Sequence, residues 1–199
     1  MNGDRASQLQ EIQRQVEELS ESPLYDYRVE HDYFPVIGEG DPNADLMFVG
    51  EAPGRREAES GRPFVGAAGK ILDELLASII LERDQVYITN IVKERPPDNR
   101  DPHQGEIELY APFLLRQIEI IQPKVIATLG RFAMDFILGQ FEAPERGEKI
   151  SQLHGNPVKV KTSYGDVVLM PLYHPAFALY QRKQLNILKE DFRKLLSYV

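Results

Sequence analysis

A glycine-rich segment of this 199-residue chain carries two carboxylates that could take part in chemistry. It comprises residues 50–57 (GEAPGRRE), in which Gly50 and Gly54 allow a tight backbone and a close approach of a ligand. Successive backbone N–H groups there can bind an anion, and Glu51 and Glu57 can activate water or stabilise positive charge. A plain strand-to-helix connection with solvated charges is the alternative interpretation.

Phe64 and Asn90 are suited to hold a flat polar ring. Phe64 lies between two glycines in GRPFVG (residues 61–66), so its ring can present a face to such a ligand. Asn90 ends a strongly apolar segment, and its amide offers one donor group and one acceptor. That pair matches the N3–H donor and O4 acceptor of uracil, whereas cytosine presents the opposite pattern. A core phenylalanine and a turn-capping asparagine are the alternatives.

His174 is placed to donate a hydrogen bond to developing negative charge. It precedes Pro175 at the start of a predicted helix, where proline is favoured and the positive helix end favours a neutral imidazole. A structural histidine is the alternative. His31, His103 and His154 have no such placement. No zinc-ligand spacing, P-loop, GxGxxG or GxSxG motif is present, so we expect no metal site.

The composition excludes several classes of protein. The chain has no cysteine, which excludes disulfides, thiolate chemistry, cysteine zinc sites and cysteine-bound iron–sulfur clusters. It has neither an apolar run of about 18 residues nor an apolar secretion signal, so we expect a cytoplasmic protein. The net charge of −8 argues against a large nonspecific nucleic-acid surface but allows a small local one.

Apolar and periodic segments predict the elements that position these side chains. Residues 20–45 lack a long periodicity and predict a loop. Strands are predicted at 46–50, 85–92, 124–129, 158–161 and 167–171, and helices at 5–19, 70–80, 106–121, 132–138, 175–181 and 185–198. This order predicts an α/β fold, a three-layer α/β/α sandwich around a short, mainly parallel sheet, in one domain over residues 1–199. The site is expected beyond the carboxyl ends of the strands.

Five segments lie in an order and spacing that resemble one known family. They are GEGDPNADLMFVGEAPG (38–54), GRPFVGAAGK (61–70), VYITNIVKERPPDNRDP (86–102), PKVIATLG (123–130) and YHPA (173–176). Together they resemble the family 4 uracil-DNA glycosylases, from about Leu19 to the C-terminus. The resemblance implies that uracil is flipped out of DNA and its N-glycosidic bond hydrolysed, which leaves free uracil and an abasic site. The alternatives are excision of hypoxanthine or xanthine, a non-catalytic uracil-DNA binder, and a protein that binds small nucleotides.

The resemblance implies roles for individual residues. Glu51 and Glu57 fall at the two acidic positions of the first motif, and they would position the water and offset positive charge on the sugar. Phe64 would stack on the flipped uracil, Asn90 would read its edge, and His174 would stabilise the uracil anion at O2. The rest of the base pocket would come from the first motif, at Gly50, Ala52, Pro53 and Gly54.

Contacts with DNA are expected next to these motifs. The family's intercalating loop would begin at Phe177, Leu179 and Arg182, where HPAFALYQRK departs from the common leucine-rich pattern. Basic residues predict a local phosphate-binding rim, with ordinary solvated surface as the alternative for some: Arg55, Arg56, Arg62, Lys93, Arg95, Arg100, Arg182 and Lys183. We expect a monomer that binds single- or double-stranded uracil-containing DNA and no membrane.

The resemblance fails at one feature of the family. Its members typically bind a [4Fe–4S] cluster through four cysteines, and the corresponding positions here hold Leu19, Ser22, Glu94 and Tyr110. None of these is a usual ligand of such a cluster. We therefore expect no cofactor, and a replacement of the cluster by packing of Leu19 and Tyr110 with Glu94 paired to an arginine.

Overall fold

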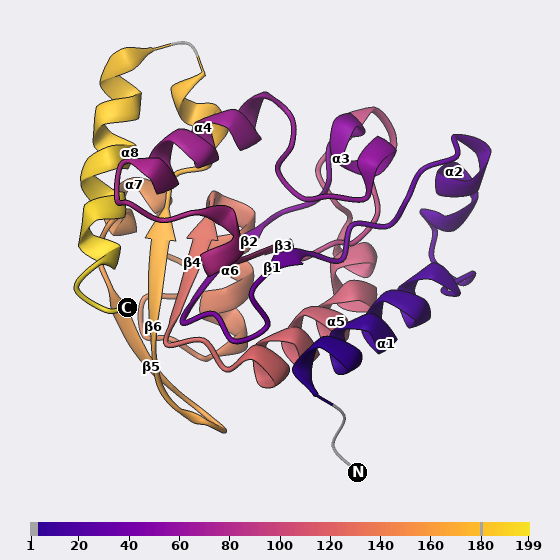
Figure 1. Ribbon diagram of the computed structural model, residues 1–199, viewed down its shortest axis with the longest axis horizontal. Coiled ribbons are helices and arrows are strands. Elements are labelled where there is room, and N and C mark those ends of the chain that lie inside the picture. Colours follow the sequence, from indigo (N-terminus) through magenta and orange to yellow (C-terminus); the bar gives the residue numbers. More distant parts are fainter. Residues whose placement is uncertain (1–3, 180) are drawn as a thin grey trace.

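A six-stranded sheet forms the middle layer of the computed structural model, which describes residues 4–179 and 181–199 without the side chain of Arg182 (Figure 1). The strands lie in the order β1-β3-β2-β4-β6-β5. Strands β3, β2, β4 and β6 run parallel, and β1 and β5 pair antiparallel at the two edges. The bounds are β1 (Glu39–Gly40), β2 (Leu46–Gly50), β3 (Tyr87–Asn90), β4 (Val125–Leu129), β5 (Val158–Thr162) and β6 (Gly165–Leu172).

Helices cover both faces of the sheet and complete the three layers. Helices α1 (Arg5–Glu17), α5 (Gln104–Ile121), α6 (Arg131–Gln140) and α7 (Ile150–Leu153) pack on one face. Helices α4 (Ala67–Ala77) and α8 (Arg182–Leu195) pack on the other. Two short helices, α2 (Tyr25–Glu30) and α3 (Arg55–Ser60), belong to the connections. The predicted α/β/α sandwich with a mainly parallel sheet is therefore confirmed.

Alternating side chains of the central strands fill the two cores. Every residue of β2 and β4 is buried, as expected for parallel strands with helices on both faces. In β2, Met47 and Val49 contact the core under α5, whereas Leu46 and Phe48 contact the core under α4 and α8. Because neighbouring side chains point to opposite faces, one short apolar run supplies both layers.

Short elements account for the differences from the predicted order. Residues 20–45 hold α2 and the two-residue strand β1, and the glycine-rich segment after β2 holds α3. The helix predicted at 175–181 is a single 3₁₀ turn, Pro175–Ala178. Elements of two to six residues are too short to produce a recognisable periodicity, so they depend on tertiary contacts rather than on local pattern.

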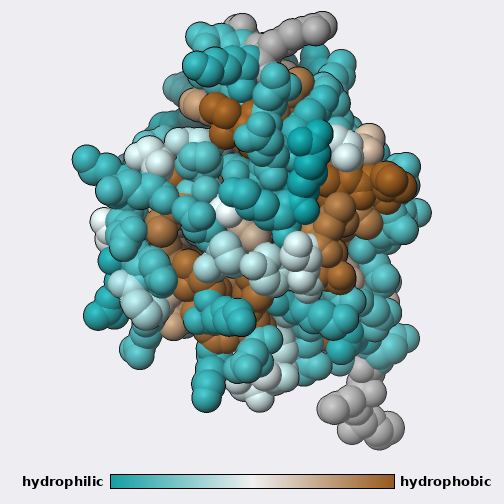
Figure 2. All heavy atoms as spheres, turned by 90° about the vertical axis from the view of Figure 1, so that its left-hand side faces the viewer, coloured by the Kyte–Doolittle hydropathy of each residue, from teal (hydrophilic) through white to brown (hydrophobic). Residues whose placement is uncertain are grey.

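The surface is largely polar where α8 and the β5–β6 edge face outward. Figure 2 shows hydrophilic residues over most of this face, with separate hydrophobic patches between them. Within the described residues, no helix combines the length and the apolar character needed to cross a membrane.

Candidate active site

Strands β2 and β3 end side by side next to a cavity. Gly50, the last residue of β2, is paired with Asn90, the last residue of β3. A Cβ atom on Gly50 would lie 2.3 Å from Asn90 Oδ1 and 2.7 Å from Phe64 Cζ, so glycine alone leaves room for both side chains. The volume of the cavity is about 470 Å³, within the range of small-molecule sites, about 300–1,000 Å³.

Segments far apart in the sequence line this cavity. The lining residues are Ala52, Gly54, Glu57, Phe64, Gly66, Ala67, Ala68, Asn90, Asn99, His174 and Ala176. The structure thus brings together six of the predicted site residues, Ala52, Gly54, Glu57, Phe64, Asn90 and His174. Pro53 is buried, and neither it nor Glu51 belongs to the lining.

Asn90 presents an unpaired acceptor at the cavity. The residue is 2% exposed, and its Oδ1 atom has no hydrogen-bond partner among the described residues. A buried acceptor left unpaired costs about 1–3 kcal/mol, so such atoms are rare and each one needs an explanation. A ligand with an N–H donor on its edge would satisfy Oδ1.

Lys93 holds the backbone of Asn90 from the opposite side of the sheet. Its Nζ atom donates to Asn90 O at 2.7 Å, to Thr89 Oγ1 at 2.8 Å and to Gln117 Oε1 at 2.6 Å. Lys93 is fully buried, so its predicted place in the phosphate-binding rim is wrong. Burial lowers the pKa of Lys93 well below its usual range. The acceptors around Nζ, which also include Ile37 O at 3.4 Å, oppose this effect because they favour the ammonium form with its three donors.

His174 is a neutral hydrogen-bond donor in this geometry. Its Nδ1 atom accepts from the backbone N–H of Ala176 at 3.1 Å, so the ring proton of the neutral imidazole lies on Nε2. Burial lowers the pKa of His174 to about 4, and the Glu57 carboxylate opposes this shift. We predicted a helix end as the cause of neutrality, but the helix is only one 3₁₀ turn, and burial accounts for the shift.

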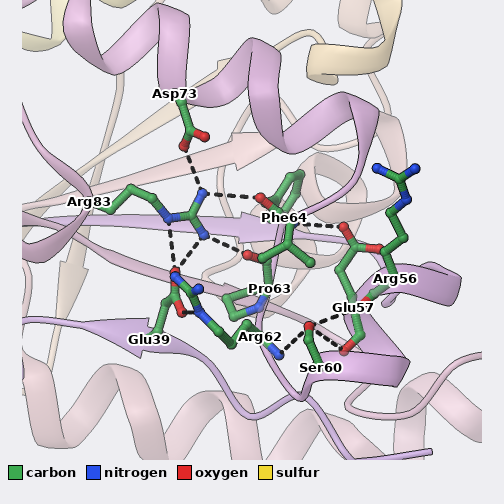
Figure 3. A network of polar contacts seen from close by, with 10 residues as sticks. Glu39, Arg56, Glu57, Ser60, Arg62, Pro63, Phe64, Asp73 and Arg83 are labelled. Atoms are coloured by element: carbon green, nitrogen blue, oxygen red, sulfur yellow. Dashed lines mark hydrogen bonds and ion pairs between the residues drawn. The ribbon is translucent and has the colours of Figure 1, made fainter.

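The two glutamates of the first motif have different surroundings. Glu57 lines the cavity, and its Oε1 accepts from the backbone N–H groups of Val65 at 2.8 Å and Gly66 at 2.7 Å, which ties α3 to the Phe64 segment (Figure 3). Glu51 is half-buried beside the lining residue Ala52. Burial, with a smaller contribution from Asp101, raises the pKa of Glu51 to about 7. Glu51 is therefore a carboxylate whose protonation changes near neutral pH.

Arg95 lies behind the lining of the cavity, next to Asn99, rather than in an exposed rim. It is 9% exposed, and its guanidinium donates to the hydroxyl groups of Tyr27 at 2.9 Å and Tyr33 at 3.1 Å. Its Nε donates to Asn99 Oδ1 at 2.8 Å, and Asn99 lines the cavity. We therefore correct its predicted role: a side chain so enclosed holds Asn99 in place instead of meeting a phosphate. No feature of the sequence marked Asn99 as a lining residue.

The remaining residues predicted to contact DNA have different surroundings. Phe177 is 37% exposed, and its ring stacks on Tyr173 with 4.4 Å between centroids. Leu179 is half-buried, and the Arg182 side chain lies outside the described part of the chain. Salt bridges join three rim arginines to carboxylates: Arg55 to Glu59, Arg62 to Glu39 and Arg100 to Glu106. Arg56 and Lys183 are exposed.

A buried polar cluster occupies three of the four positions at which the resemblance implies cysteines. The hydroxyl groups of Ser22 and Tyr110 lie 2.7 Å apart, and each bonds to Glu94 Oε2. The other carboxylate oxygen of Glu94 accepts from Arg28 Nε at 2.5 Å. Leu19, at the fourth position, packs against the core. The predicted pairing of Glu94 with an arginine is confirmed, with Arg28 as the partner.

Comparisons with known proteins agree on one family. Residues 37–198 match the model of the uracil DNA glycosylase superfamily. A type-4 uracil-DNA glycosylase of Sulfurisphaera tokodaii is 45% identical over 94% of this chain and 83% of that protein. A type-4 enzyme of Archaeoglobus fulgidus is 43% identical over 94% of this chain and 91% of its own length, and one of Thermotoga maritima is 41% identical over 82% of each. The chain therefore belongs to the uracil-DNA glycosylase superfamily, among its type-4 members.

Proposed function

We propose that the protein hydrolyses the N-glycosidic bond of uracil in DNA, releases free uracil and leaves an abasic site. One observation carries this proposal: the unpaired Oδ1 of Asn90 and the Nε2–H donor of neutral His174 belong to the same cavity. A uracil edge offers N3–H to the first group and its O2 oxygen to the second. The names of the type-4 relatives support the same reaction.

The target base must leave the helix to reach this cavity. Unstacking costs a few kcal/mol, least in a single strand or a mismatch. Stacking on the ring of Phe64 would recover part of that cost, because aromatic pairs contribute about 0.5–1.5 kcal/mol beyond their buried area. The Asn90 amide would then accept from N3–H and donate to O4, a pattern that cytosine cannot match.

Bond cleavage separates charge, and the site has groups for both ends. Electrons from the glycosidic bond move onto the uracil ring, where the Nε2–H group of His174 would stabilise the anion at O2. The sugar becomes cationic, and the carboxylates of Glu51 and Glu57 would stabilise this positive charge. A fixed donor aimed at developing charge contributes about 3–4 kcal/mol to lowering the barrier.

Glu51 is the better candidate for the group that activates water. Its pKa of about 7 suits a base that works near neutral pH. Glu57 is less suited, because its Oε1 already accepts hydrogen bonds from two backbone N–H groups. Only the ionised form is a base, so the excision rate is expected to rise as the pH increases from about 6 to 8.

The variant Glu51→Gln should abolish this rise and slow excision by about 10²-fold at pH 8, the lower end of the range for general-base help. The lower end applies because an oxocarbenium-like transition state needs little help from the attacking water. Single-turnover rates between pH 5 and 9 give the measurement. Glu57→Gln is the matched variant. It should be slower than the wild type but keep the rise in rate with increasing pH. If the Glu51→Gln enzyme keeps the rise in rate with pH, a group other than Glu51 is the base.

Alkali cleavage of an oligonucleotide with a single uracil tests the proposed reaction. The wild-type protein should yield an alkali-labile site and free uracil, and an oligonucleotide with thymine at the same position should stay intact. Matched oligonucleotides with hypoxanthine or xanthine test the other bases. Tight binding of the uracil strand without any abasic product would contradict the proposal and favour a non-catalytic binder.

We also propose that the protein works as a monomer and without an iron–sulfur cluster. A mass in solution equal to that of one chain would support the first part, and a larger assembly would contradict it. The residues at the four cluster positions do not fit iron, because leucine has no ligand atom and the Ser22, Glu94 and Tyr110 side chains satisfy one another. Stoichiometric iron in the purified protein would contradict the second part.

The Glu94 cluster should contribute to stability instead. In Glu94→Gln the charge opposite Arg28 is lost and one acceptor becomes an amide donor, so we expect unfolding to become easier by about 1–3 kcal/mol. Urea denaturation measures this change. Glu18→Gln is the control, because Glu18 forms an exposed ion pair with Arg14 and such pairs contribute about 0–1 kcal/mol. Equal effects of the two substitutions would show that the cluster has no special structural role.

A further inference from the structure

Phe64 has a backbone conformation that phenylalanine rarely adopts. Its φ angle is +51°, in the left-handed region, which a bulky side chain disfavours. Such a conformation is strained and persists only where the surroundings enforce it. The backbone there also lies very close to helix α4, because a Cβ atom on Gly69 would lie only 1.8 Å from Phe64 O. The structure must therefore contain groups that hold this segment in place.

Arg83, from the turn before β3, binds the backbone of this segment directly. Its Nη2 donates to Pro63 O at 2.6 Å, and its Nη1 donates to Phe64 O at 3.1 Å (Figure 3). The two carbonyl groups flank the strained Phe64 residue. A planar guanidinium with fixed donor directions can hold two neighbouring carbonyls at once.

Two carboxylates hold the guanidinium of Arg83 in turn. Glu39 Oε1 accepts from Nε at 2.9 Å and from Nη2 at 2.6 Å, and Asp73 Oδ1 accepts from Nη1 at 2.9 Å. With the two carbonyl contacts, all five N–H donors of Arg83 are used. The side chains of Arg83 and Glu39 are 21% and 22% exposed, so this ion pair is screened by water less than an open surface pair.

The held segment carries the ring that meets the substrate in the proposed function. Phe64 lines the cavity, and its ring centroid lies 5.7 Å from that of His174. Arg83 itself is not among the lining residues. Any effect of Arg83 on the base therefore passes through the position of Phe64.

We infer that Arg83 is a positioning residue for base stacking. Its guanidinium group fixes the Pro63–Phe64 backbone and so presents the Phe64 ring to the flipped base. This inference rests on the proposed function. Stacking contributes to binding in the ground state and the transition state alike, so its loss raises the concentration needed for half-maximal binding and leaves the rate at saturation little changed.

The test compares Arg83→Met with Arg14→Met by inhibition of excision with free uracil. Arg14 likewise pairs with two carboxylates, those of Glu11 and Glu18, but it lies exposed on α1 and belongs neither to the cavity lining nor to the predicted rim, so it is a matched control. In Arg83→Met the uracil inhibition constant and KM should rise about two- to tenfold, the loss of one aromatic stack, with kcat within about threefold. Arg14→Met should change none of these.

A double-mutant cycle with Phe64→Ala separates positioning from general damage. Once the ring is absent, Arg83→Met should add less than twofold to the uracil inhibition constant. The inference would be overturned if Arg83→Met raised the inhibition constant by the same factor with and without the Phe64 ring. It would also be overturned if Arg83→Met alone left the inhibition constant unchanged. If Arg83→Met does not fold, Arg83→Lys carries the same comparison, because a single ammonium cannot hold both carbonyls.

Failure of this inference is distinguishable from failure of the proposed function. A wild-type protein without abasic product would remove the proposed function. A wild type that excises uracil, with Arg83→Met and Arg14→Met behaving alike, would remove only the role of Arg83.

Discussion

Replacing Asn90 with alanine should slow uracil excision by about 30- to 10⁴-fold. The substitution leaves the N3–H and O4 groups of uracil without partners in an enclosed site, and each unpaired group costs about 1–3 kcal/mol. The loss should appear in kcat/KM. The fold should persist, because Asn90 Oδ1 makes no hydrogen bond within the described protein.

Single-turnover rates on a uracil-containing oligonucleotide measure this effect. Asn156→Ala is the matched control, since Asn156 is exposed and does not line the cavity. An Asn90→Ala enzyme within threefold of the wild type would mean that the amide does not read the base.

His174→Ala should lower the single-turnover rate by about 10²–10³-fold, the usual effect of removing one donor from an anion-stabilising site. His174→Gln keeps an N–H donor on a side chain of similar reach and should recover part of the rate. Recovery by glutamine distinguishes loss of the donor from loss of packing against Phe64.

The pH dependence tests the protonation state of His174. With a pKa of about 4 the imidazole is neutral above that pH, so it should contribute no change in rate between pH 5 and 9. Only below pH 5 should protonation begin, and the rate should then fall as Nδ1 can no longer accept from Ala176. In the Glu51→Gln background the profile from pH 5 to 9 should be flat. A fall in the excision rate centred near pH 6.5 in that background would show that burial does not lower the pKa of His174.

The main elements of the fold were predictable because of the way parallel sheets are buried. Strands such as Leu46–Gly50 are covered on both faces, so they read as unbroken apolar runs. The long helix Gln104–Ile121 was predictable from its spacing and from the proline that follows its end. The strand Glu39–Gly40 was not, because two residues carry no pattern and this strand exists only through its pairing with β3.

The polar residues that line the cavity were easier to predict than those that support them. Asn90 is the last residue of β3 and His174 follows the end of β6, where the topology of α/β sheets concentrates binding groups. Lys93 and Arg83 look like surface residues in the sequence. Lys93 is buried against Gln117, 24 residues away, and Arg83 meets Glu39, 44 residues away. Partners so distant in sequence leave no local signal.

The position of free uracil in a crystal structure of the complex tests the central claim most directly. We predict the ring against Phe64, its N3–H and O4 on the Asn90 amide, and its O2 within hydrogen-bond distance of His174 Nε2. Uracil held elsewhere on the protein, or in this cavity with its O2 turned away from His174, would contradict the account.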